Sequence, residues 1–389
     1  MEKQSSRNLW CACLIAFAFS VNYTNHAPIA QILMKAFSFD KASAGLLTTG
    51  MFFTHAFMQI PGGILGDKLG GRRVVIFAMS LVFLGNIGIT FSDNYTELLI
   101  WKIITGFGTG ASFIGGAKYI YQTTKTEKLH LFQGYYGASV LFGSGFVIFC
   151  LPQIVAYFNN NWIYGFYTTA SIALVALLVW LSFAPSSHPE VHPHVKLTTI
   201  LFDKSLLLLG SVQMASFGLS IVIGTWITVL LKENFKTLNG WEISAVASMI
   251  LILGIFFRPL GGKLIPVLGI KKVIIFSLLM ITIGCFILAI TNISFPVAIV
   301  ALLILGMGCG LPYVSVFTRA SQLFPGRVGV AMGLANMLGM IMILVGAPLV
   351  GKVKDMTNSY SSSFIVLGLF ALLICVINIF SYKNKIQNS

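Results

Sequence analysis

Charged side chains are scarce in this sequence, and acidic ones are the scarcest. Of its 389 residues 9% are charged, and only 11 are Asp or Glu. A soluble domain of this length needs far more charge on its surface, whereas lipid accepts apolar side chains all round a helix. Hydrophobic residues make up 57% of the chain, and its mean hydropathy is +0.88. The shortage of charge therefore excludes an ordinary soluble protein and predicts an integral membrane protein.

Several kinds of functional motif are missing as well. The six cysteines lie scattered in apolar segments without metal-like spacing, so we expect neither a disulfide framework nor a metal site. No nucleophile–base constellation, cofactor motif or nucleic-acid motif is present, so we predict no enzyme activity, no cofactor and no nucleic-acid partner. No small-residue cleavage site follows the first apolar run, and we expect that run to remain as a membrane span.

The apolar runs are long and do not alternate with polar residues, which favours spanning helices over barrel strands. We predict an all-α membrane protein with twelve transmembrane helices in two pseudo-symmetric six-helix bundles. The first bundle occupies residues 1–184 and the second residues 205–389. The predicted spans are residues 8–33, 43–66, 73–91, 97–121, 131–158, 162–184, 205–231, 242–264, 272–290, 295–321, 329–351 and 361–382.

A polar cytoplasmic connector, residues 185–204, separates the two predicted bundles. It contains the segment HPEVHPH at residues 188–194, whose three histidines suggest a metal site. Prolines break any regular ligand geometry there, so we interpret the segment as a flexible tether.

A glycine-rich charged hairpin, QIPGGILGDKLGGRRV at residues 59–74, joins the second and third predicted spans. Its pattern returns in the second half, where Gly62 and Gly70 recur 199 positions later as Gly261 and Gly269. A GxGxG triplet at residues 106–110 also returns at residues 306–310. Internal symmetry with glycine- and proline-interrupted helices is typical of secondary transporters, whose sites lie between the repeats. The chain is therefore predicted to be a duplicated membrane protein.

The basic residues indicate an orientation. With a cytoplasmic N-terminus, 17 lysines and arginines lie in inside loops or at the inside ends of spans, six lie in outside segments, and the remaining two, Lys102 and Arg258, are embedded. Since basic residues collect in cytoplasmic loops, we expect both termini in the cytoplasm. This distribution also explains the net charge of +14 without a nucleic-acid partner. Short loops fit a bacterial inner membrane, and an organelle membrane is the alternative.

The hairpin carries a family resemblance. Residues 63–73, GILGDKLGGRR, are similar to the signature between helices 2 and 3 of the major facilitator superfamily, and they depart from it at Gly71, where a basic residue is usual. Residues 102–108, KIITGFG, resemble the helix-4 motif of that family, with lysine in place of arginine. The helix-5 antiporter motif is half present, with its glycines but without its proline. The likeness covers essentially the whole chain and implies a monomeric transporter.

The resemblance implies a gate at the hairpin. Asp67 lies beside Lys68, Arg72 and Arg73 at helix ends, where a carboxylate can pair with cations and meet helix dipoles. In the family such contacts hold one of two access states and break in the other. A plain solvated turn is the alternative. In the second copy Pro266 replaces the aspartate, so we expect that hairpin to have lost the gate contact.

Arg258 is the most informative residue for function. It lies about 10 Å inside the eighth predicted span, and no carboxylate in the apolar interior of the predicted spans is available to pair with it. A charge at such depth is costly unless it faces water or a partner, and the guanidinium suits an anion. The alternative is a side chain that extends to the cytoplasmic head groups.

The stretch that begins at Arg258, RPLGG, resembles helix 8 of the nitrate/nitrite porter branch. In that branch one arginine from helix 2 and one from helix 8 clamp the anion. The corresponding helix-2 position, 199 residues earlier, is Gln59, so only one of the two arginines is present. A singly clamped anion is the expectation that follows.

Other polar residues are candidates for the same site. His55 and Gln59 are one helical turn apart, and His55 is either a substrate ligand, a protonatable switch or an interhelical hydrogen-bonding group. Lys102 is a second embedded cation, which either adds positive potential to the cavity or reaches the outer interface. The remaining candidates are Asn25, Thr105, Thr109, Gln213 and Tyr313.

We therefore predict a secondary active transporter for a small anionic or carboxylate-bearing solute that works by alternating access. Its expected partners are the solute, the lipid bilayer, and a coupling proton or a counter-transported anion. Two alternatives remain open: a proton-driven exporter of amphipathic compounds, and a non-transporting membrane protein on the same fold.

Overall fold

The computed structural model describes residues 2–187 and 195–381, and nearly all of this part of the chain is helical. The histidines of the HPEVHPH segment lie outside the described residues. We call residues 2–187 the first half and residues 195–381 the second half.

The helices of the first half are α1 (Glu2–Thr24), α2 (Ala30–Ala36), α3 (Lys41–Phe57), α4 (Gln59–Leu69), α5 (Gly71–Ile89), α6 (Tyr95–Thr123), α7 (Thr126–Tyr157) and α8 (Trp162–Phe183). Those of the second half are α9 (Leu197–Leu201), α10 (Lys204–Gln213), α11 (Leu219–Asn234), α12 (Gly240–Leu268), α13 (Ile270–Leu288), α14 (Phe295–Gly310), α15 (Pro312–Leu323), α16 (Val328–Thr357) and α17 (Tyr360–Ser381). A π-helical segment, Met214–Gly218, joins α10 to α11. Short 3-10 turns precede α2 and α16.

Ten helical segments of the described chain are long and apolar enough to cross a membrane. Their bounds match ten of the predicted spans within a few residues, as for α8 and the predicted span 162–184. The other two predicted spans coincide with α1 and with α3 plus α4. The first ends earlier than predicted, because α1 stops at Thr24.

Proline explains where two predicted helices are interrupted. The second predicted span is divided at Met58, between α3 and α4. Pro61 follows three residues later, and a proline ring clashes with the carbonyl four residues before it. The tenth predicted span is likewise divided at Leu311, directly before Pro312. Both breaks lie in helices that line or border the cavity described below.

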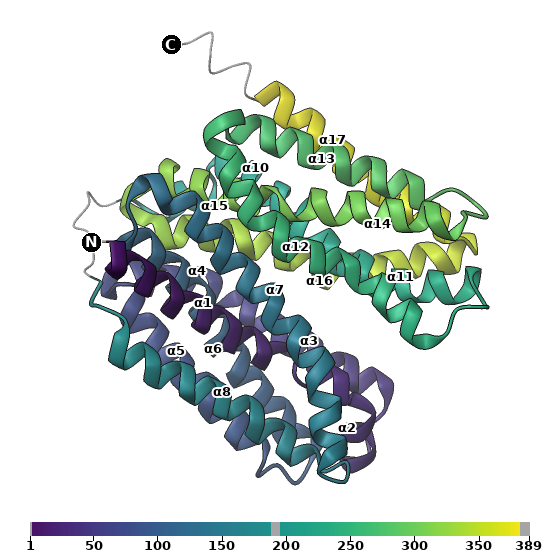
Figure 1. Ribbon diagram of the computed structural model, residues 1–389, viewed down its shortest axis with the longest axis horizontal. Coiled ribbons are helices and arrows are strands. Elements are labelled where there is room, and N and C mark those ends of the chain that lie inside the picture. The colour runs from purple at the N-terminus through teal and green to yellow at the C-terminus, as the bar shows by residue number, and fades with distance from the viewer. Residues whose placement is uncertain (1, 188–194, 382–389) are drawn as a thin grey trace.

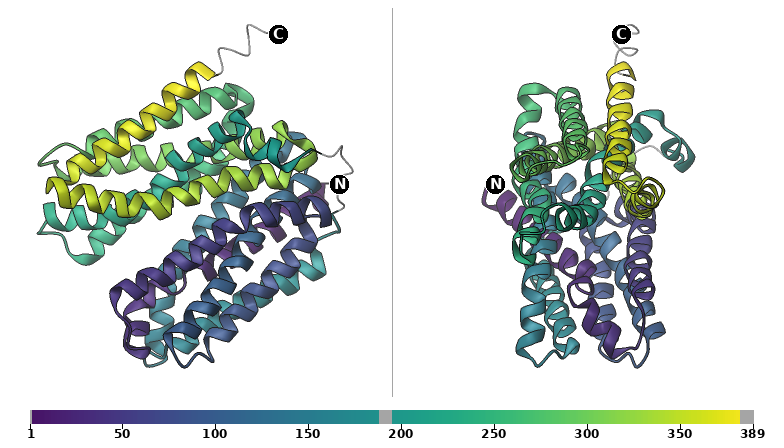
Figure 2. Two further views of the ribbon diagram at one scale, coloured as in Figure 1. Left: turned by 180° about the vertical axis from the view of Figure 1, so that it is seen from behind. Right: turned by 90° about the vertical axis from the view of Figure 1, so that its right-hand side faces the viewer.

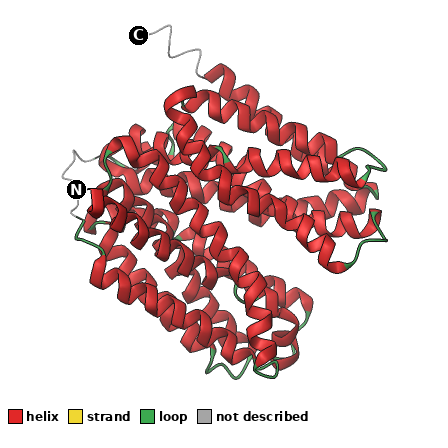
Figure 3. Ribbon diagram, in the orientation of Figure 1, coloured by secondary structure: helices red, strands yellow, loops and turns green. Residues whose placement is uncertain are grey.

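The two halves occupy separate regions of the molecule. In Figure 1 the purple-to-teal helices α1–α8 lie at the lower left and the green-to-yellow helices α10–α17 at the upper right. Both views of Figure 2 show long helices running in the same general direction within each group. The groups meet at the end where α1 begins and diverge toward the opposite end (Figures 1 and 2). Short loops join the helices at both ends (Figure 3).

The predicted hairpin repeat is present in the backbone itself. Gly70 precedes α5 with φ of 83°, and Gly269 precedes α13 with φ of 80°. These are the two glycines that the sequence places 199 positions apart, and φ values in this region favour glycine. Each hairpin therefore turns at the same residue of the repeat.

The 199-residue spacing also relates the two helix crossings at which the halves are in contact. Where α4 crosses α16, a Cβ atom at Gly63 would lie 2.5 Å from the carbonyl oxygen of Gly329. Where α12 crosses α7, a Cβ atom at Gly262 would lie 2.6 Å from the carbonyl oxygen of His130. Gly63 and Gly262 are 199 positions apart, and so are His130 and Gly329. The two crossings are thus equivalent, and small residues bring the backbones into contact at both.

Packing also explains the departure from the family signature at Gly71. A Cβ atom there would lie 2.5 Å from the carbonyl oxygen of Gly115 and 2.6 Å from the backbone nitrogen of Tyr119. Both are backbone atoms of α6 and cannot turn away as a flexible side chain can. A basic residue, usual at this position in the family, does not fit between α5 and α6 in this chain.

We therefore predict that Gly71→Ala destabilises the protein and that Gly71→Arg destabilises it more. The expected cost is about 1–3 kcal/mol of unfolding free energy for the smaller change, as for overpacking in general. Thermal melting in detergent measures the effect. The control is Gly45→Ala, because no atom lies within 4 Å of a Cβ atom built there. Equal melting temperatures for Gly71→Arg and the parent would contradict the packing explanation.

Candidate functional site

A small cavity lies between the two halves of the chain. The first half contributes side chains from α1, α3, α6 and α7, and the second half from α10, the π-helical segment, α12, α15 and α16. Its volume is about 10 Å³, room for roughly one water molecule. The lining residues are Phe19, Tyr23, His55, Phe113, Val140, Gln213, Phe217, Arg258, Tyr313, Asn336 and Met340.

Arg258 is the one cation among these lining residues, and none of them is acidic. The side chain is buried, with 3% of its residue surface exposed. One guanidinium nitrogen, Nη1, donates to the carbonyl oxygen of Gly137 at 2.5 Å. The guanidinium carbon lies 4.3 Å from the ring centre of Tyr313 and 5.7 Å from that of Phe217. The guanidinium therefore contacts aromatic rings and a carbonyl oxygen, and the cavity lining contains no carboxylate that neutralises its charge.

Two glycines of α7 place Arg258 in this position. A Cβ atom at Gly134 would lie 2.7 Å from the Cα atom of Pro259, so α7 and α12 cross with their backbones in contact. At Gly137 any side chain would overlap the Tyr313 ring. Gly134 and Gly137, which belong to the half-present helix-5 motif, therefore leave room for Pro259 and for the Tyr313 ring. The close packing brings the Gly137 carbonyl within hydrogen-bonding distance of the guanidinium.

Several buried polar atoms of the cavity have no hydrogen-bond partner among the described residues. They are Nε of Arg258, the hydroxyl of Tyr313, Nε2 of His55, Oε1 of Gln213 and Nδ2 of Asn336. An unsatisfied buried polar group costs about 1–3 kcal/mol, so such groups rarely collect without a reason. Gln213 Nε2 donates to Asn336 Oδ1 at 3.2 Å, and whichever way the two amides turn, one donor and one acceptor stay free. The arrangement is suited to a polar ligand.

His55 projects into the cavity from α3. Its Nδ1 lies 3.0 Å from Oγ1 of Thr109 on α6, and its ring meets the ring of Tyr23 edge to face. Gln59 is one turn further along the chain and donates from Nε2 to the His55 carbonyl at 3.1 Å. The structure therefore brings Thr109 and His55 together, while Gln59 is buried beside them without being a lining residue.

Lys102 and Asn25 lie in a separate polar network inside the first half. Lys102 is fully buried, so its ammonium does not reach the outer interface. It donates to Oδ1 of Asn25 at 2.8 Å and to the carbonyl of Asn22 at 3.2 Å. Asn25, the residue that follows α1, in turn donates to Asn86 of α5 and Thr169 of α8. Neither Lys102 nor Asn25 is a lining residue of the cavity.

Thr105 is also placed apart from the cavity. Its hydroxyl donates to the Trp101 carbonyl at 2.9 Å within α6, against Gly85 of α5. Of the nine candidates for substrate contact, the structure puts His55, Gln213, Arg258 and Tyr313 in the cavity lining. Thr109 supports one of them, and Gln59 lies next to it.

The aromatic and aliphatic wall of the cavity is what sequence reasoning missed. Phe19 and Tyr23 are four residues apart on α1, and Tyr313 and Phe317 are four apart on α15. Phe113 packs edge to face against Phe317 with ring centres 5.7 Å apart, which links the halves. Aromatic pairs at this spacing share a helix face, but core residues show the same pattern, so sequence alone does not single them out.

Asp67 is the gate candidate that crosses between the halves. Its carboxylate accepts from the backbone nitrogens of Gly329 at 2.8 Å and Val330 at 3.2 Å, at the beginning of α16. Its cation is Lys118 of α6, 3.1 Å away, and both side chains are buried. A carboxylate at a helix N-terminus is stabilised by charged hydrogen bonds and by the helix dipole. This constellation joins α4, α6 and α16, and we call it the Asp67 latch.

The other three gate candidates are Lys68, Arg72 and Arg73. Lys68 and Arg73 are exposed. Arg72 donates from its guanidinium to the carbonyls of Ala184 at 2.7 Å and Leu181 at 3.0 Å, at the end of α8. Cations at a helix C-terminus are favourable, so Arg72 secures α5 to α8 within the first half. Sequence proximity to Asp67 suggested pairing with these residues, whereas the actual partner, Lys118, comes from a helix 51 positions further along the chain.

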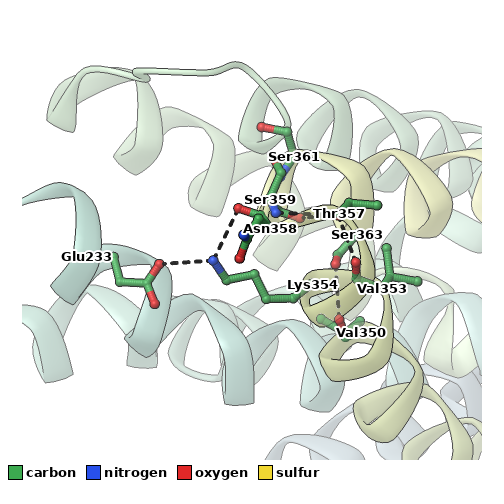
Figure 4. Close-up of polar contacts among 9 residues, drawn as sticks. All are labelled: Glu233, Val350, Val353, Lys354, Thr357, Asn358, Ser359, Ser361 and Ser363. Carbon is green, nitrogen blue, oxygen red and sulfur yellow. Dashed lines mark hydrogen bonds and ion pairs between the residues drawn. The ribbon is translucent and has the colours of Figure 1, made fainter.

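A second ion pair lies in the second half, away from the latch. Figure 4 shows Lys354 extended from α16 toward Glu233 at the end of α11, with Nζ to carboxylate oxygen at 3.6 Å. Nζ also donates to the Asn358 carbonyl at 3.4 Å and lies 4.7 Å from the Tyr360 ring centre. These side chains are partly exposed, and such pairs contribute about 0–1 kcal/mol. The pair secures helices of one half to each other and does not join the halves.

Comparison with known proteins identifies one family of membrane transporters. The model of the Major Facilitator Superfamily matches residues 12–347. The voltage-gated purine nucleotide uniporter SLC17A9 of Mus musculus is 23% identical over 374 residues, 89% of this chain and 83% of the relative. The probable nitrate transporter NarT of Staphylococcus carnosus is 23% identical over 358 residues, 90% of this chain and 89% of the relative.

Solved structures share the fold. The fucose:proton symporter FucP of E. coli superposes with a TM-score of 0.77 at 16% identity, over 96% of this chain and 98% of that one. The human organic anion transporter MFSD10 superposes with a TM-score of 0.76 at 14% identity, over 96% of this chain and 99% of that one.

We predict that Asp67→Ala loosens the start of α16. Removing both acceptor oxygens frees the amides of Gly329 and Val330 and leaves Lys118 buried without its partner. Hydrogen bonds to a charged group contribute about 1.5–3 kcal/mol, so these two amides are expected to exchange hydrogen about tenfold faster or more. Exchange measured by mass spectrometry reports it. Lys68→Gln, a change at the exposed neighbour, is the control. Unchanged exchange in Asp67→Ala would refute the latch.

Proposed function

Because the chain belongs to the Major Facilitator Superfamily, we propose that it is a secondary active transporter that moves a small anionic or carboxylate-bearing solute across a membrane. The observation that carries the proposal is Arg258, a buried guanidinium in a cavity that both halves line. Its partners in the structure are a carbonyl oxygen and two aromatic rings.

The energetics of Arg258 favour an anionic ligand. A buried charge without a counter-charge is costly, and by default it marks a functional site within a membrane. Free donors lie around it, namely its own Nε, the Tyr313 hydroxyl and one amide of the Gln213–Asn336 pair. A guanidinium with such neighbours suits a carboxylate or another planar anion. Relatives named as nitrate transporters and as a probable galactarate/D-glucarate transporter are consistent with an anion.

The proposed working cycle is alternating access between two six-helix bundles, residues 1–184 and 205–389, with the connector and both termini in the cytoplasm. The cavity has room for about one water molecule, so a larger solute enters only when its walls separate. The Asp67 latch joins the halves by charged hydrogen bonds and must break when they part at that end.

The proposal extends to coupling and environment. His55 lines the cavity with a free Nε2 and can take up a proton, so a proton is one candidate for the coupling ion, and a counter-transported anion is the other. We place the protein in a bacterial inner membrane as a monomer surrounded by lipid.

The aromatic wall gives some support to a rival, proton-driven export of amphipathic compounds. The lining cation counts against cationic amphiphiles, because like charge repels them. A non-transporting protein on the same fold would keep the cavity sealed. Uptake into proteoliposomes separates these possibilities: flux of an anion supports the proposal, flux of cations alone supports the exporter, and no flux supports the non-transporter.

We predict that Arg258→Gln abolishes anion binding and that Arg258→Lys retains part of it. A ligand that binds the folded state raises the melting temperature with its occupancy, so a thermal-shift screen of purified protein against small anions measures binding. Lys354→Gln is the control, since it removes a cation that only secures helices of the second half. An anion-induced shift that survives in Arg258→Gln would overturn the assignment of the site.

A further inference from the structure

We infer that the cavity selects a singly charged carboxylate with a small apolar body, in preference to dicarboxylates and to bare inorganic anions such as nitrate. This inference rests on the proposed function and adds the chemical class of the substrate. It follows from three features of the cavity: the number of charges, the position of the free donors and the nature of the remaining wall.

The charge count allows one anionic group. Arg258 is the single cation among the lining residues. The second embedded cation, Lys102, is occupied by Asn25 and Asn22 within the first half. Lys118 is paired with Asp67 in the latch. A second carboxylate on the ligand would therefore be buried without a counter-charge, which strongly opposes binding in a site that excludes water.

The free donors named above belong to residues of the second half. Nε of Arg258 and the hydroxyl of Tyr313 have no partner among the described residues, and one amide of the Gln213–Asn336 pair has a free donor. The Tyr313 ring centre lies 4.3 Å from the guanidinium carbon, so the side chains of Arg258 and Tyr313 are neighbours. They match the two oxygens of one carboxylate.

Apart from His55 and the Tyr23 hydroxyl, the first-half wall of the cavity is apolar. Phe19, Phe113 and Val140 line the cavity from that side, and Met340 adds a flexible apolar side chain from α16. Phe19 and Phe113 pack edge to face with ring centres 6.0 Å apart. Burial of a hydrocarbon body against this wall improves affinity by about fourfold for each methylene group. Nitrate has no such body, so it gains nothing from this wall.

A ligand series at pH 8, above the usual pKa of an imidazole, tests the inference with Arg258 as the single cation of the lining. Dissociation constants of acetate, propionate and butyrate, measured by calorimetry, are expected to fall by about fourfold per methylene until the space between the separated walls is filled. The sharpest comparison is monomethyl succinate against succinate, which differ by one charge at similar length. We expect monomethyl succinate to bind at least about tenfold more tightly. Succinate or nitrate binding as tightly as butyrate, and depending on Arg258, would overturn the inference.

A variant provides the converse test. Gln213→Lys adds a second cation to the same wall, so succinate is expected to bind this variant more tightly than monomethyl succinate does. Gln213→Met, which adds no charge at the same position, is the matched control: it is expected to weaken the binding of both ligands and to leave monomethyl succinate the tighter of the two. Melting of both variants without ligand shows whether they are folded. Retained preference for monomethyl succinate in a folded Gln213→Lys protein would contradict the charge count.

The outcomes separate this inference from the proposed function. If no anion stabilises the parent protein and none is taken up by proteoliposomes, the proposed function fails. If anions bind through Arg258 but dicarboxylates or nitrate are preferred, the function stands and the substrate class is wrong.

Discussion

Backbone contact between the two halves is the constraint on which the rest of the structure depends. At the crossings of α4 with α16 and of α7 with α12, glycines remove the side chains that would hold the helices apart. Such contact brings Asp67 within reach of the amides of α16 and the Gly137 carbonyl within reach of Arg258. A larger residue at any of these glycines moves a latch atom or a cavity atom as well as the helices.

The polar groups of the chain are divided into three sets by what satisfies them. The Lys102 network is satisfied within the first half. The Lys102 ammonium donates to Asn25 at the end of α1, and Asn25 donates to side chains of α5 and α8. The Asp67 latch is satisfied only while the halves are together. The cavity groups around Arg258 are left unsatisfied. The Lys102 network, the latch proposed for gating and the groups proposed for binding thus belong to different polar clusters, which have no residue in common.

Sequence reasoning reached the fold because the fold depends on local and periodic signals. Apolar length located ten of the spans, and the hairpin repeat placed Gly70 and Gly269 at positions where positive φ requires glycine. The breaks at Met58 and Leu311 follow the proline rule but were not predicted, because the apolar runs continue through them. The two embedded cations were found as residues, yet only Arg258 lines the cavity. The partners of Lys102 come from helices far apart in sequence, so its placement required the structure.

The 199-residue repeat has a consequence for how the two copies differ. The first copy has Asp67 and Gln59, and the second has Pro266 and Arg258 at the equivalent positions. The first copy therefore has the carboxylate at the helix crossing, and the second copy has the guanidinium that faces the cavity. A symmetric pair built from either copy alone would have two such carboxylates and no cavity guanidinium, or two guanidinium groups and no such carboxylate. A single chain with two copies can carry different side chains at equivalent positions, and here it places one carboxylate at a helix crossing and one cation in the cavity.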